Sequence, residues 1–568
     1  MRRTSLTSVL GLLAFVGFTL YLLRSHRDRK HFHAPLPELT KEIAPSTETS
    51  HPIHQLITKA QDDHEQLLNK QSDSLQKAVE EYRRRYLLPP PPNFDKWWEF
   101  AKARNVQLID EYDTIYHSLL PFWGLQPRDV RSRAREALGF DNALLGVYVR
   151  DGKVVTAAGG TEWQQQSTIG MLKEFVQYLP NIDLPFNVHD EPRVVVPHDD
   201  LSRLLVVANN KIAATSGSSA PKNAWSPPSE ELGDGTRAYE VKTTRFNKYA
   251  HQPTWTESRM SCSPDSPARF LDEAPQDDSS SFTFSQLGFI KNKTAFSDIC
   301  LSPSLREHFG FFDRPNAFNI VHDLFPIFSQ SKVSSYQDIL YPSPWYWSDK
   351  VPYKEENDYA WDQKQNKVYW RGSTTGGFSR DGGWRRQHRQ QFVDKFNGRT
   401  NATIMVNEGG AGWTTKDVPR KDYNELIDVH FAHVGQCDPG DCDAQREYFD
   451  VLNPDKQNAA WGYKYLVDVD GNAFSGRFYA FLKSMSLVYK MAIFREWHEE
   501  WLKPWVHYIP LSLHGAEYVE SVRYFHDEEE GRVQAARLAV QGREWADRVL
   551  RKEDFEVWLF RLLLESVH

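Results

Sequence analysis

Residues 463–478 read Tyr-Lys-Tyr-Leu-Val-Asp-Val-Asp-Gly-Asn-Ala-Phe-Ser-Gly-Arg-Phe, and this stretch decides the expected fold. The segment from Lys464 to Val469 is rich in β-branched and aromatic residues, which predicts a short buried strand. Polar turn residues follow, and the apolar residues after them recur at helical spacing. A strand, a tight polar loop and a helix in this order present backbone N–H groups to an anion.

The turn and the helix contain the residues that carry this interpretation. Asp470, Gly471 and Asn472 predict the turn, because Gly and Asn tolerate positive φ. The helical pattern begins at Phe474 and continues through residues 485–489. Arg477 lies in its first turn, where the helix dipole disfavours a cation unless an anion pairs with it. The alternative is that Arg477 pairs only with a surface carboxylate.

A second stretch, residues 371–377, reads Arg-Gly-Ser-Thr-Thr-Gly-Gly and follows a predicted strand at residues 367–370. Its glycines, hydroxyls and arginine fork suit an anion, although its spacing matches neither a P-loop nor the dinucleotide fingerprint. A glycine-rich surface turn is the alternative. Two such loops in one lobe fit a diphosphate better than one. The candidate ligands are Arg371, Gly372, Ser373, Thr374, Asp470, Gly471, Asn472, Ser475 and Arg477.

Three further features have a functional and a structural interpretation. Asp468 and Asp470 could hold a divalent metal, but an aspartate at a turn commonly caps its own loop, and we favour no metal. Cys437 and Cys442 flank a tight turn and predict a small disulfide rather than a zinc site. His507 lies among apolar and aromatic residues and is expected in the core.

Composition limits the function classes. The chain has 568 residues, enough for two or three domains, and 40% hydrophobic and 25% charged residues are ordinary for a globular protein. The net charge of −8 argues against nucleic acid as a partner. Four cysteines are too few for a disulfide scaffold. Aromatic residues reach 13%, which suits large cores and also sugar-handling surfaces.

The N-terminal region predicts a membrane anchor. Residues 5–23 form an uncharged apolar run after a short tail, residues 1–4, and a cleavable signal peptide is the rival interpretation. Basic residues flank the run on both sides, so they do not fix its orientation. The sequons at Asn292 and Asn401, together with a second separable cysteine pair, Cys262 with Cys300, favour a lumenal body.

Residues 24–92 are expected to form a stem. Leu68, Leu75 and Tyr82 repeat every seven residues among polar ones, which suggests a helix with a thin apolar seam. A run of four prolines, residues 89–92, ends it. The body is then expected to comprise an N-terminal lobe (93–345), a C-terminal lobe (346–515) and C-terminal helices that pack back on the lobes (516–568).

Within the body, strands alternate with helices, which predicts an α/β fold of two doubly wound lobes. Residues 145–157 predict a hairpin with an Asp-Gly turn. The strand Leu184 to Val188 runs into His189-Asp190-Glu191-Pro192, and polar groups after such a strand face the ligand crevice. Further strands are predicted at residues 403–406 and 505–510.

The ordered motifs resemble glycosyltransferase family 90, which includes fungal capsule-associated xylosyltransferases and Rumi-type protein O-glucosyltransferases. The motifs are Tyr369-Trp370-Arg371-Gly372-Ser373, Lys464 to Asn472, Ser475-Gly476-Arg477-Phe478 and Trp505 to Pro510. The segment Asp338-Ile339-Leu340-Tyr341-Pro342 is similar as well. The resemblance covers roughly residues 94 to 560.

The resemblance implies a GT-B fold, with two Rossmann-like lobes across a cleft, and a UDP-sugar donor, xylose or glucose. It implies inversion at the anomeric carbon without an obligate metal, although a divalent metal remains an alternative. The segment Asn187 to Pro192 matches the family's Asn-x-x-Asp-x-Pro pattern, so the resemblance gives Asp190 the role of catalytic base. Arg371 and Arg477 match its diphosphate arginines. Rumi-type enzymes have arginine where Thr374 stands, so acceptor specificity does not transfer.

The expected protein is therefore a single-pass type II glycosyltransferase of the Golgi, or of the endoplasmic reticulum, with a glycan or glycoprotein acceptor. No C-terminal retrieval tetrapeptide is present, which favours the Golgi. A non-catalytic carbohydrate-binding or scaffolding protein on the same fold is the alternative. A glycoside hydrolase would need two carboxylates at one bond and gives no reason for the arginine-containing loops.

Overall fold

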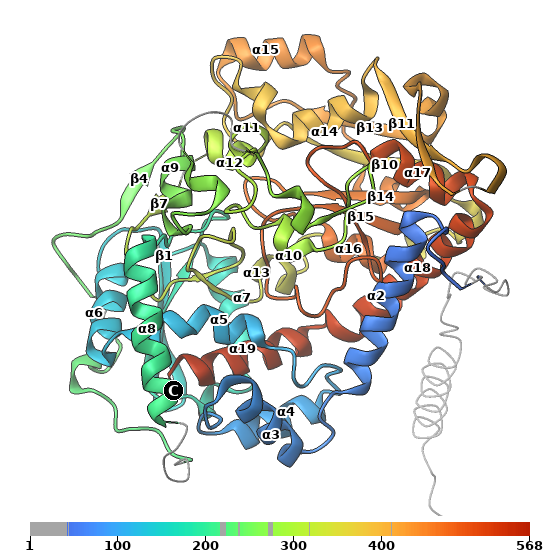
Figure 1. The fold of residues 1–568 in the computed structure, drawn as a ribbon. Coiled ribbons are helices and arrows are strands. Elements are labelled where there is room, and N and C mark those ends of the chain that lie inside the picture. The colour runs from blue at the N-terminus through green and yellow to red at the C-terminus, as the bar shows by residue number, and fades with distance from the viewer. Residues whose placement is uncertain are drawn as a thin grey trace, which may run out of the picture.

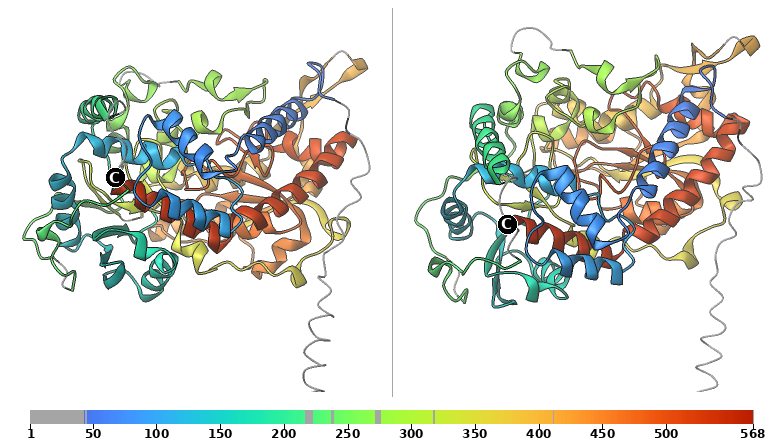
Figure 2. Two further views of the ribbon diagram at one scale, coloured as in Figure 1. Left: turned by 90° about the horizontal axis from the view of Figure 1, so that it is seen from below. Right: turned by 60° about the horizontal axis from the view of Figure 1, so that its bottom comes forward.

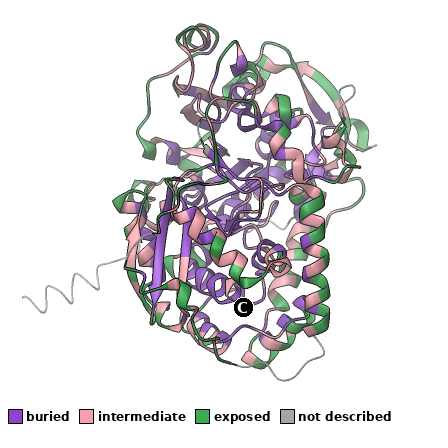
Figure 3. Ribbon diagram, turned by 90° about the vertical axis from the view of Figure 1, so that its left-hand side faces the viewer, coloured by how far each residue is buried: buried purple, intermediate pink, exposed green. Residues whose placement is uncertain are grey.

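The computed structural model describes residues 43, 45–215, 223–236, 239–270, 276–316, 318–410 and 412–567. These residues form a mixed α/β structure around two five-stranded sheets (Figure 1). Helices surround both sheets, and the strands make up much of the buried interior (Figure 3). None of the helices in this part of the chain combines the length and the apolar character that a membrane span needs. The tail 1–4 and the predicted anchor 5–23 lie outside the described residues.

The N-terminal sheet has the strand order β2-β1-β3-β8-β9 and is mixed. β1 runs antiparallel to both β2 and β3, whereas β3, β8 and β9 run parallel to one another. The predicted hairpin is confirmed, with φ of +48° at Asp151 and +71° at Gly152, as a type I′ turn requires. The strands are β1 (Leu144–Arg150), β2 (Lys153–Ala158), β3 (Ile182–Asn187), β8 (Phe328–Ser329) and β9 (Ile339–Leu340).

Helices and a long insertion complete this half of the molecule. The helices before and between its strands are α5 (Asp113–Leu119), α6 (Pro127–Leu138), α7 (Glu162–Leu172) and α8 (His198–Thr215). The insertion before β8 contains α9 (Trp255–Ser258), α10 (Lys293–Phe296), α11 (Leu305–His308), α12 (Gly310–Asp313), and the strand pairs β4 (Asn247–Tyr249) with β7 (Phe318–Ile320) and β5 (Thr283–Phe284) with β6 (Phe289–Ile290). The predicted disulfide between Cys262 and Cys300 is present in it.

The C-terminal sheet is entirely parallel and has the order β13-β10-β14-β15-β16. Numbered along the chain, this is the doubly wound order 2-1-3-4-5, whose connections leave β10 and β14 toward opposite sides. The edge of the sheet between the carboxyl ends of β10 and β14, called the crevice below, is where ligands of such sheets bind. The strands are β10 (Gln365–Ser373), β13 (Ile427–His433), β14 (Tyr463–Val469), β15 (Leu487–Met491) and β16 (Ile509–Pro510).

Two predictions in this half need correction, and a third is confirmed outside the main sheet. The helix expected from Phe474 is only α16 (Phe478–Lys483), because residues 487–491 form β15. β15 is buried along its whole length, and a short apolar run of this kind cannot be assigned to strand or helix by spacing. Of residues 505–510, only β16 is a strand. The strand predicted at 403–406 exists, but it belongs to a separate hairpin of β11 (Asn401–Val406) and β12 (Thr414–Pro419).

Residues 24–92 were expected to stand apart as a stem, and their described part instead packs on the body. α2 (Pro52–Asn69) runs beside α18 (Glu529–Val549) in Figures 1 and 2, and Gln61 bonds to Gln541 at 3.3 Å. α3 (Leu75–Tyr86) is a separate helix, so the seven-residue repeat does not form one seam. Apolar residues of both helices belong to the main cores: Ile53, Leu56, Ile57, Ala78, Tyr82 and Tyr86.

The last three helices connect the two halves. They are α17 (Tyr518–Asp527), α18 and α19 (Lys552–Ser566), and α19 runs from the C-terminal half into the N-terminal half (Figure 2). There it packs on α4 (Phe94–Ala103), where the Trp97 indole donates to the carbonyl of Val557 at 3.1 Å. The remaining helices are α13 (Pro344–Trp347), α14 (His388–Asn397) and α15 (Pro439–Tyr448), the last carrying the predicted Cys437–Cys442 disulfide.

If α2 is part of the body, Ile53→Ala should lower the free energy of unfolding by about 2–5 kcal/mol, because it leaves a cavity in a packed core. Denaturant unfolding of the full-length chain measures this. Gln66→Ala, an exposed position of the same helix, is the matched control and should change stability by less than about 0.5 kcal/mol. Equal, small effects of both substitutions would mean that α2 is a detachable stem.

Candidate active site

Two loops meet at the carboxyl edge of the C-terminal sheet, in the crevice between β10 and β14. The first, residues 371–377, turns at Gly376 and Gly377, whose φ angles are +113° and +150°. The N–H of Gly376 donates to the side-chain oxygen of Asn472 in the second loop at 3.1 Å. The guanidinium of Arg477 donates to the carbonyl of Arg371 at 2.6 Å. The structure thus brings together the two stretches that the sequence singled out as anion sites.

Arg389, in the first turn of α14, forms hydrogen bonds with both loops. Its guanidinium donates to the carbonyl of Asp470 at 2.8 Å, to the hydroxyl of Thr375 at 2.7 Å and to the carbonyl of Ser373 at 3.2 Å. Gly471 has no positive φ in the structure; a Cβ there would lie 3.1 Å from the guanidinium, so this glycine gives Arg389 room. Arg389 lies twelve residues after the end of the predicted loop, and no sequence motif identifies it.

Arg389 and Arg477 give the crevice a positive charge that no ion pair in the described part of the chain neutralises. Burial and the neighbouring Arg477 lower the pKa of Arg389 to about 9. Burial also lowers the pKa of Arg477. Of the five N–H donors of the Arg477 guanidinium, one is used, in the bond to Arg371. A buried and a half-buried cation that lie close together and have unused donors are stabilised by an anion between them.

Two predicted ligands have other roles. Arg371 pairs with Asp428 at 2.6 Å and with Asp455 at 3.3 Å, so its charge is already matched. Thr374 is buried, and its hydroxyl exchanges hydrogen bonds of 3.0 Å with the backbone of Gly435. Both residues shape the loop after β10, and neither side chain is free for an anion. Gly372 and Ser373 lie in β10 itself, with the Ser373 hydroxyl 2.8 Å from that of Thr375.

The carboxylates of the second loop are also engaged. Asp470 does not cap its own turn, because its carboxylate accepts the N–H groups of Ile493 and Phe494 at 2.8 and 3.1 Å. Burial raises the pKa of Asp470 to about 6. Asp468 accepts the Ser475 hydroxyl and pairs with Lys490 at 2.8 Å. Among the described residues, no group of three or more His, Cys, Asp or Glu side chains is placed to hold a metal ion.

The other predicted site residue, Asp190, lies in a loop of the N-terminal sheet. The loop after β3 is held by Asn187, whose side chain accepts the N–H of His189 at 3.0 Å and donates to the carbonyl of Glu191 at 2.7 Å. The same side chain accepts from the buried guanidinium of Arg193. Asp338 accepts the backbone N–H of Arg193 at 2.9 Å. The conformation of this loop is therefore set without any contribution from the carboxylate of Asp190.

Asp190 itself is exposed, and its carboxylate bonds to no residue that the structure describes. The side chain is accessible to solvent, yet the surrounding protein raises its pKa by desolvation alone. Both observations fit a carboxylate in a recess, where water reaches it but many protein atoms lie nearby. Asn187 thus performs the turn-capping role that was the alternative for Asp190. The carboxylate of Asp190 is left available for chemistry.

Contacts between loops at the carboxyl ends of the two sets of parallel strands close the site. α13 follows β9, and the Trp345 indole donates to the carbonyl of Gly476 at 3.1 Å. After β8, Lys332 forms an isolated bridge with Arg495, in the loop after β15. The loop with Asp190 therefore lies on the same side of its sheet as the segments that contact the arginine-containing crevice.

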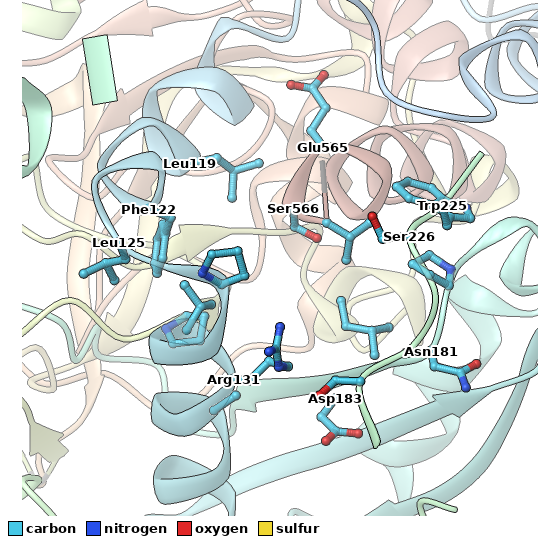
Figure 4. Close-up of a pocket in the computed structure, with 18 of the residues that line it drawn as sticks. Leu119, Phe122, Leu125, Arg131, Asn181, Asp183, Trp225, Ser226, Glu565 and Ser566 are labelled. Atoms are coloured by element: carbon cyan, nitrogen blue, oxygen red, sulfur yellow. The ribbon is translucent and has the colours of Figure 1, made fainter. Parts of the chain in front are cut away.

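A large cavity lies elsewhere in the described part of the chain. Its volume is ≈1750 Å³, and Leu119, Phe122, Arg131, Asp183 and Trp225 are among the side chains that line it (Figure 4). Its lining includes none of the residues placed at the crevice above. His507 is a core residue, as predicted, with its ring stacked on Trp545 at 5.4 Å. This cavity is therefore separate from the loops that the sequence predicts as anion sites.

Comparison with known proteins relates part of the chain to a glycosyltransferase family. Residues 312–566 match the family model described as glycosyl transferase family 90. The chain is 34% identical to "O-glucosyltransferase rumi" of Drosophila pseudoobscura pseudoobscura over 110 residues, which is 18% of this chain and 26% of that protein. It is 25% identical to "O-glucosyltransferase rumi homolog" of Aedes aegypti over 262 residues, 42% of this chain and 54% of that protein. The family match contains the arginine-containing crevice and leaves Asp190 outside.

If the crevice binds a diphosphate, Arg477→Ala should weaken the binding of UDP by about 2–3 kcal/mol, because charge-assisted hydrogen bonds are lost in a partly desolvated site. Arg389→Ala should weaken it as well, since the loops lose both a charge and their connection. Calorimetry with UDP measures both. Arg380→Ala, which removes an exposed partner of Asp438, is the control and should leave the affinity within about threefold. Unchanged binding by a folded Arg477→Ala variant would exclude this crevice.

Proposed function

We propose that this chain, whose residues 312–566 belong to glycosyl transferase family 90, is an inverting glycosyltransferase that moves a sugar from a UDP-sugar to a hydroxyl group of a glycan or glycoprotein. One observation carries the proposal. Asp190, a carboxylate without an internal partner, lies in the loop after a parallel strand of one sheet, and Arg389 and Arg477, two cations without an ion pair, hold the loops at the carboxyl ends of the parallel strands of the other.

This arrangement suits the charges of the reaction. The acceptor hydroxyl oxygen attacks the anomeric carbon, and Asp190 takes its proton as the new C–O bond forms. The bond from the anomeric carbon to the phosphate oxygen breaks on the opposite side, and the electron pair leaves with UDP. Arg477 and Arg389 receive the negative charge that develops on the diphosphate. These two arginines supply the cationic charge that a metal would otherwise contribute, so we propose that none is required.

The two-sheet architecture supports a GT-B arrangement as part of this proposal. The C-terminal sheet has the doubly wound order of a nucleotide-binding lobe. The N-terminal sheet departs from it, because β1 runs antiparallel to the other four strands. It would serve as the acceptor lobe, since it carries Asp190. The relatives' names specify O-glucosyl transfer, which makes glucose one candidate sugar beside xylose.

The proposed location is the lumen of the Golgi or endoplasmic reticulum, with residues 5–23 as a type II anchor. Support comes from the apolar sequence of that segment and from the two disulfides, which persist in oxidising compartments.

The test of donor and acceptor is a screen of the purified full-length chain for hydrolysis and transfer with a panel of UDP-sugars. Failure to bind UDP or to hydrolyse any UDP-sugar would overturn the proposed function.

Asp190→Asn should reduce transfer by at least about 100-fold, the usual effect of losing a general base. The substitution keeps the shape of the side chain, and Asn187 holds the loop, so the melting temperature and the affinity for UDP should stay near wild type. Steady-state kinetics together with calorimetry separate these effects. A variant with near-normal turnover would exclude Asp190 as the base, and one that fails to fold would make it structural.

The same assignment predicts how the rate depends on pH. Desolvation raises the folded-state pKa of Asp190 above its ordinary value, so the base becomes protonated at a higher pH than a free aspartate would. We expect kcat/KM to fall as the pH is lowered through this raised pKa, because only the carboxylate accepts the proton. A pH–rate profile measures it. A profile flat from pH 7 down to about 4 would contradict a base of raised pKa.

A further inference from the structure

The segment α13 contacts both the loop that ends in Arg477 and the helix α7. Ser343 begins it, and its hydroxyl accepts the N–H of Trp345 at 3.1 Å. The next two side chains reach the loop after β14, where Trp345 donates to the carbonyl of Gly476 and Tyr346 donates to that of Ser475. Tyr346 also stacks on Tyr479 at 3.6 Å. α13 is thus fastened to the loop that ends in Arg477.

Gly476 lets the indole of Trp345 lie directly against the backbone. A Cβ at Gly476 would be 2.4 Å from the indole nitrogen and 2.9 Å from the adjacent ring carbon. Any other residue would displace the ring. The absence of a side chain at this position, one residue before Arg477, therefore fixes the indole beside the arginine proposed to bind the diphosphate.

Trp345 also contacts α7, which in turn bonds to the loop of Asp190. Its ring meets that of Trp163 edge to face, with centroids 6.2 Å apart. The next residue, Gln164, donates to the carbonyl of Val188 at 3.0 Å, two residues before Asp190. A short chain of contacts thus runs from Arg477 through Trp345 and Trp163 to the loop of Asp190. Trp345 and Trp163 are only half-buried, so part of each ring is accessible.

We propose that the accessible face of Trp345 is the floor of the subsite for the transferred sugar. The inference rests on the proposed function, in which the sugar lies between the diphosphate and the base. C–H groups on one face of a sugar ring pack against an aromatic face, whose π electrons attract their partial positive charge. The ring gains positive character as the bond to UDP breaks, and an indole stabilises such a cation best among the side chains. Trp345 would therefore favour the transition state.

Trp347 provides a matched control from the same helical turn. It is also a half-buried tryptophan, but a Cβ on Gly170 of α7 would lie 2.9 Å from its indole nitrogen. Lys552 of α19 covers its ring at 5.0 Å. Trp347 therefore packs between two helices and shares the size and chemistry of Trp345 without its proposed contact with the sugar.

The test compares Trp345→Ala, Trp345→Phe and Trp347→Phe in the full-length chain. Calorimetry with UDP reports the nucleotide site, and hydrolysis of the UDP-sugar that the wild type uses best reports the sugar. We expect Trp345→Ala to keep UDP affinity within about threefold and to lose about 10- to 30-fold in kcat, the scale of a desolvated cation–π contact. Trp345→Phe keeps an aromatic face and should retain most of the rate. Trp347→Phe should match the wild type.

Other outcomes overturn the inference. An unchanged kcat for Trp345→Ala would mean that the indole does not contact the sugar. A Trp345→Phe variant as impaired as Trp345→Ala would assign the effect to the lost hydrogen bond with Gly476, as would a parallel loss of UDP affinity. If these variants fail in this way while the wild type binds UDP and hydrolyses its sugar, the proposed function stands without this subsite.

Discussion

The buried guanidinium of Arg389 is the interaction on which the site depends. It donates to carbonyl and hydroxyl groups of the loops after β10 and β14, and so fixes the crevice at the point where the order of the parallel sheet reverses. Carbonyl groups accept hydrogen bonds from Arg389 but do not neutralise its positive charge, and Arg477 adds a second positive charge. On the other sheet, hydrogen bonds of the Asn187 side chain fix the loop of Asp190, and the carboxylate of Asp190 takes no part in them. Hydrogen bonds thus fix the backbone of the crevice, while the charges of Arg389 and Arg477 have no ion-pair partner among the described residues.

Much of this could be predicted from the sequence, because the signals are local. The strand before Asp470, the Asp-Gly hairpin and the two disulfides follow from patterns of a few residues, and all are present. Arg477 stood out because a cation at the start of a helix needs a partner, and the structure gives it unused donors. The resemblance to a known family supplied the role of Asp190, and the described contacts leave that role open to it.

The remainder depends on contacts between distant segments. Arg371 was predicted as a diphosphate ligand, but Asp428 and Asp455, both far along the chain, neutralise it. Arg389 has no motif, since its importance arises only where three segments meet. The helix predicted through residue 489 ends early because a buried parallel strand and a buried helix have the same apolar composition. The helices at residues 52–86 have polar sequences typical of a stem, and only their apolar faces, buried in the cores, show otherwise.

The most direct measurement is a crystal structure of the full-length chain, or of its soluble part, with UDP bound. The account predicts diphosphate oxygens within hydrogen-bond distance, about 2.7–2.9 Å, of the guanidinium of Arg477 in the crevice between β10 and β14. It also predicts that Arg371 keeps its pairs with Asp428 and Asp455. A diphosphate bound away from Arg477, for instance in the large cavity beside Arg131, would contradict the account.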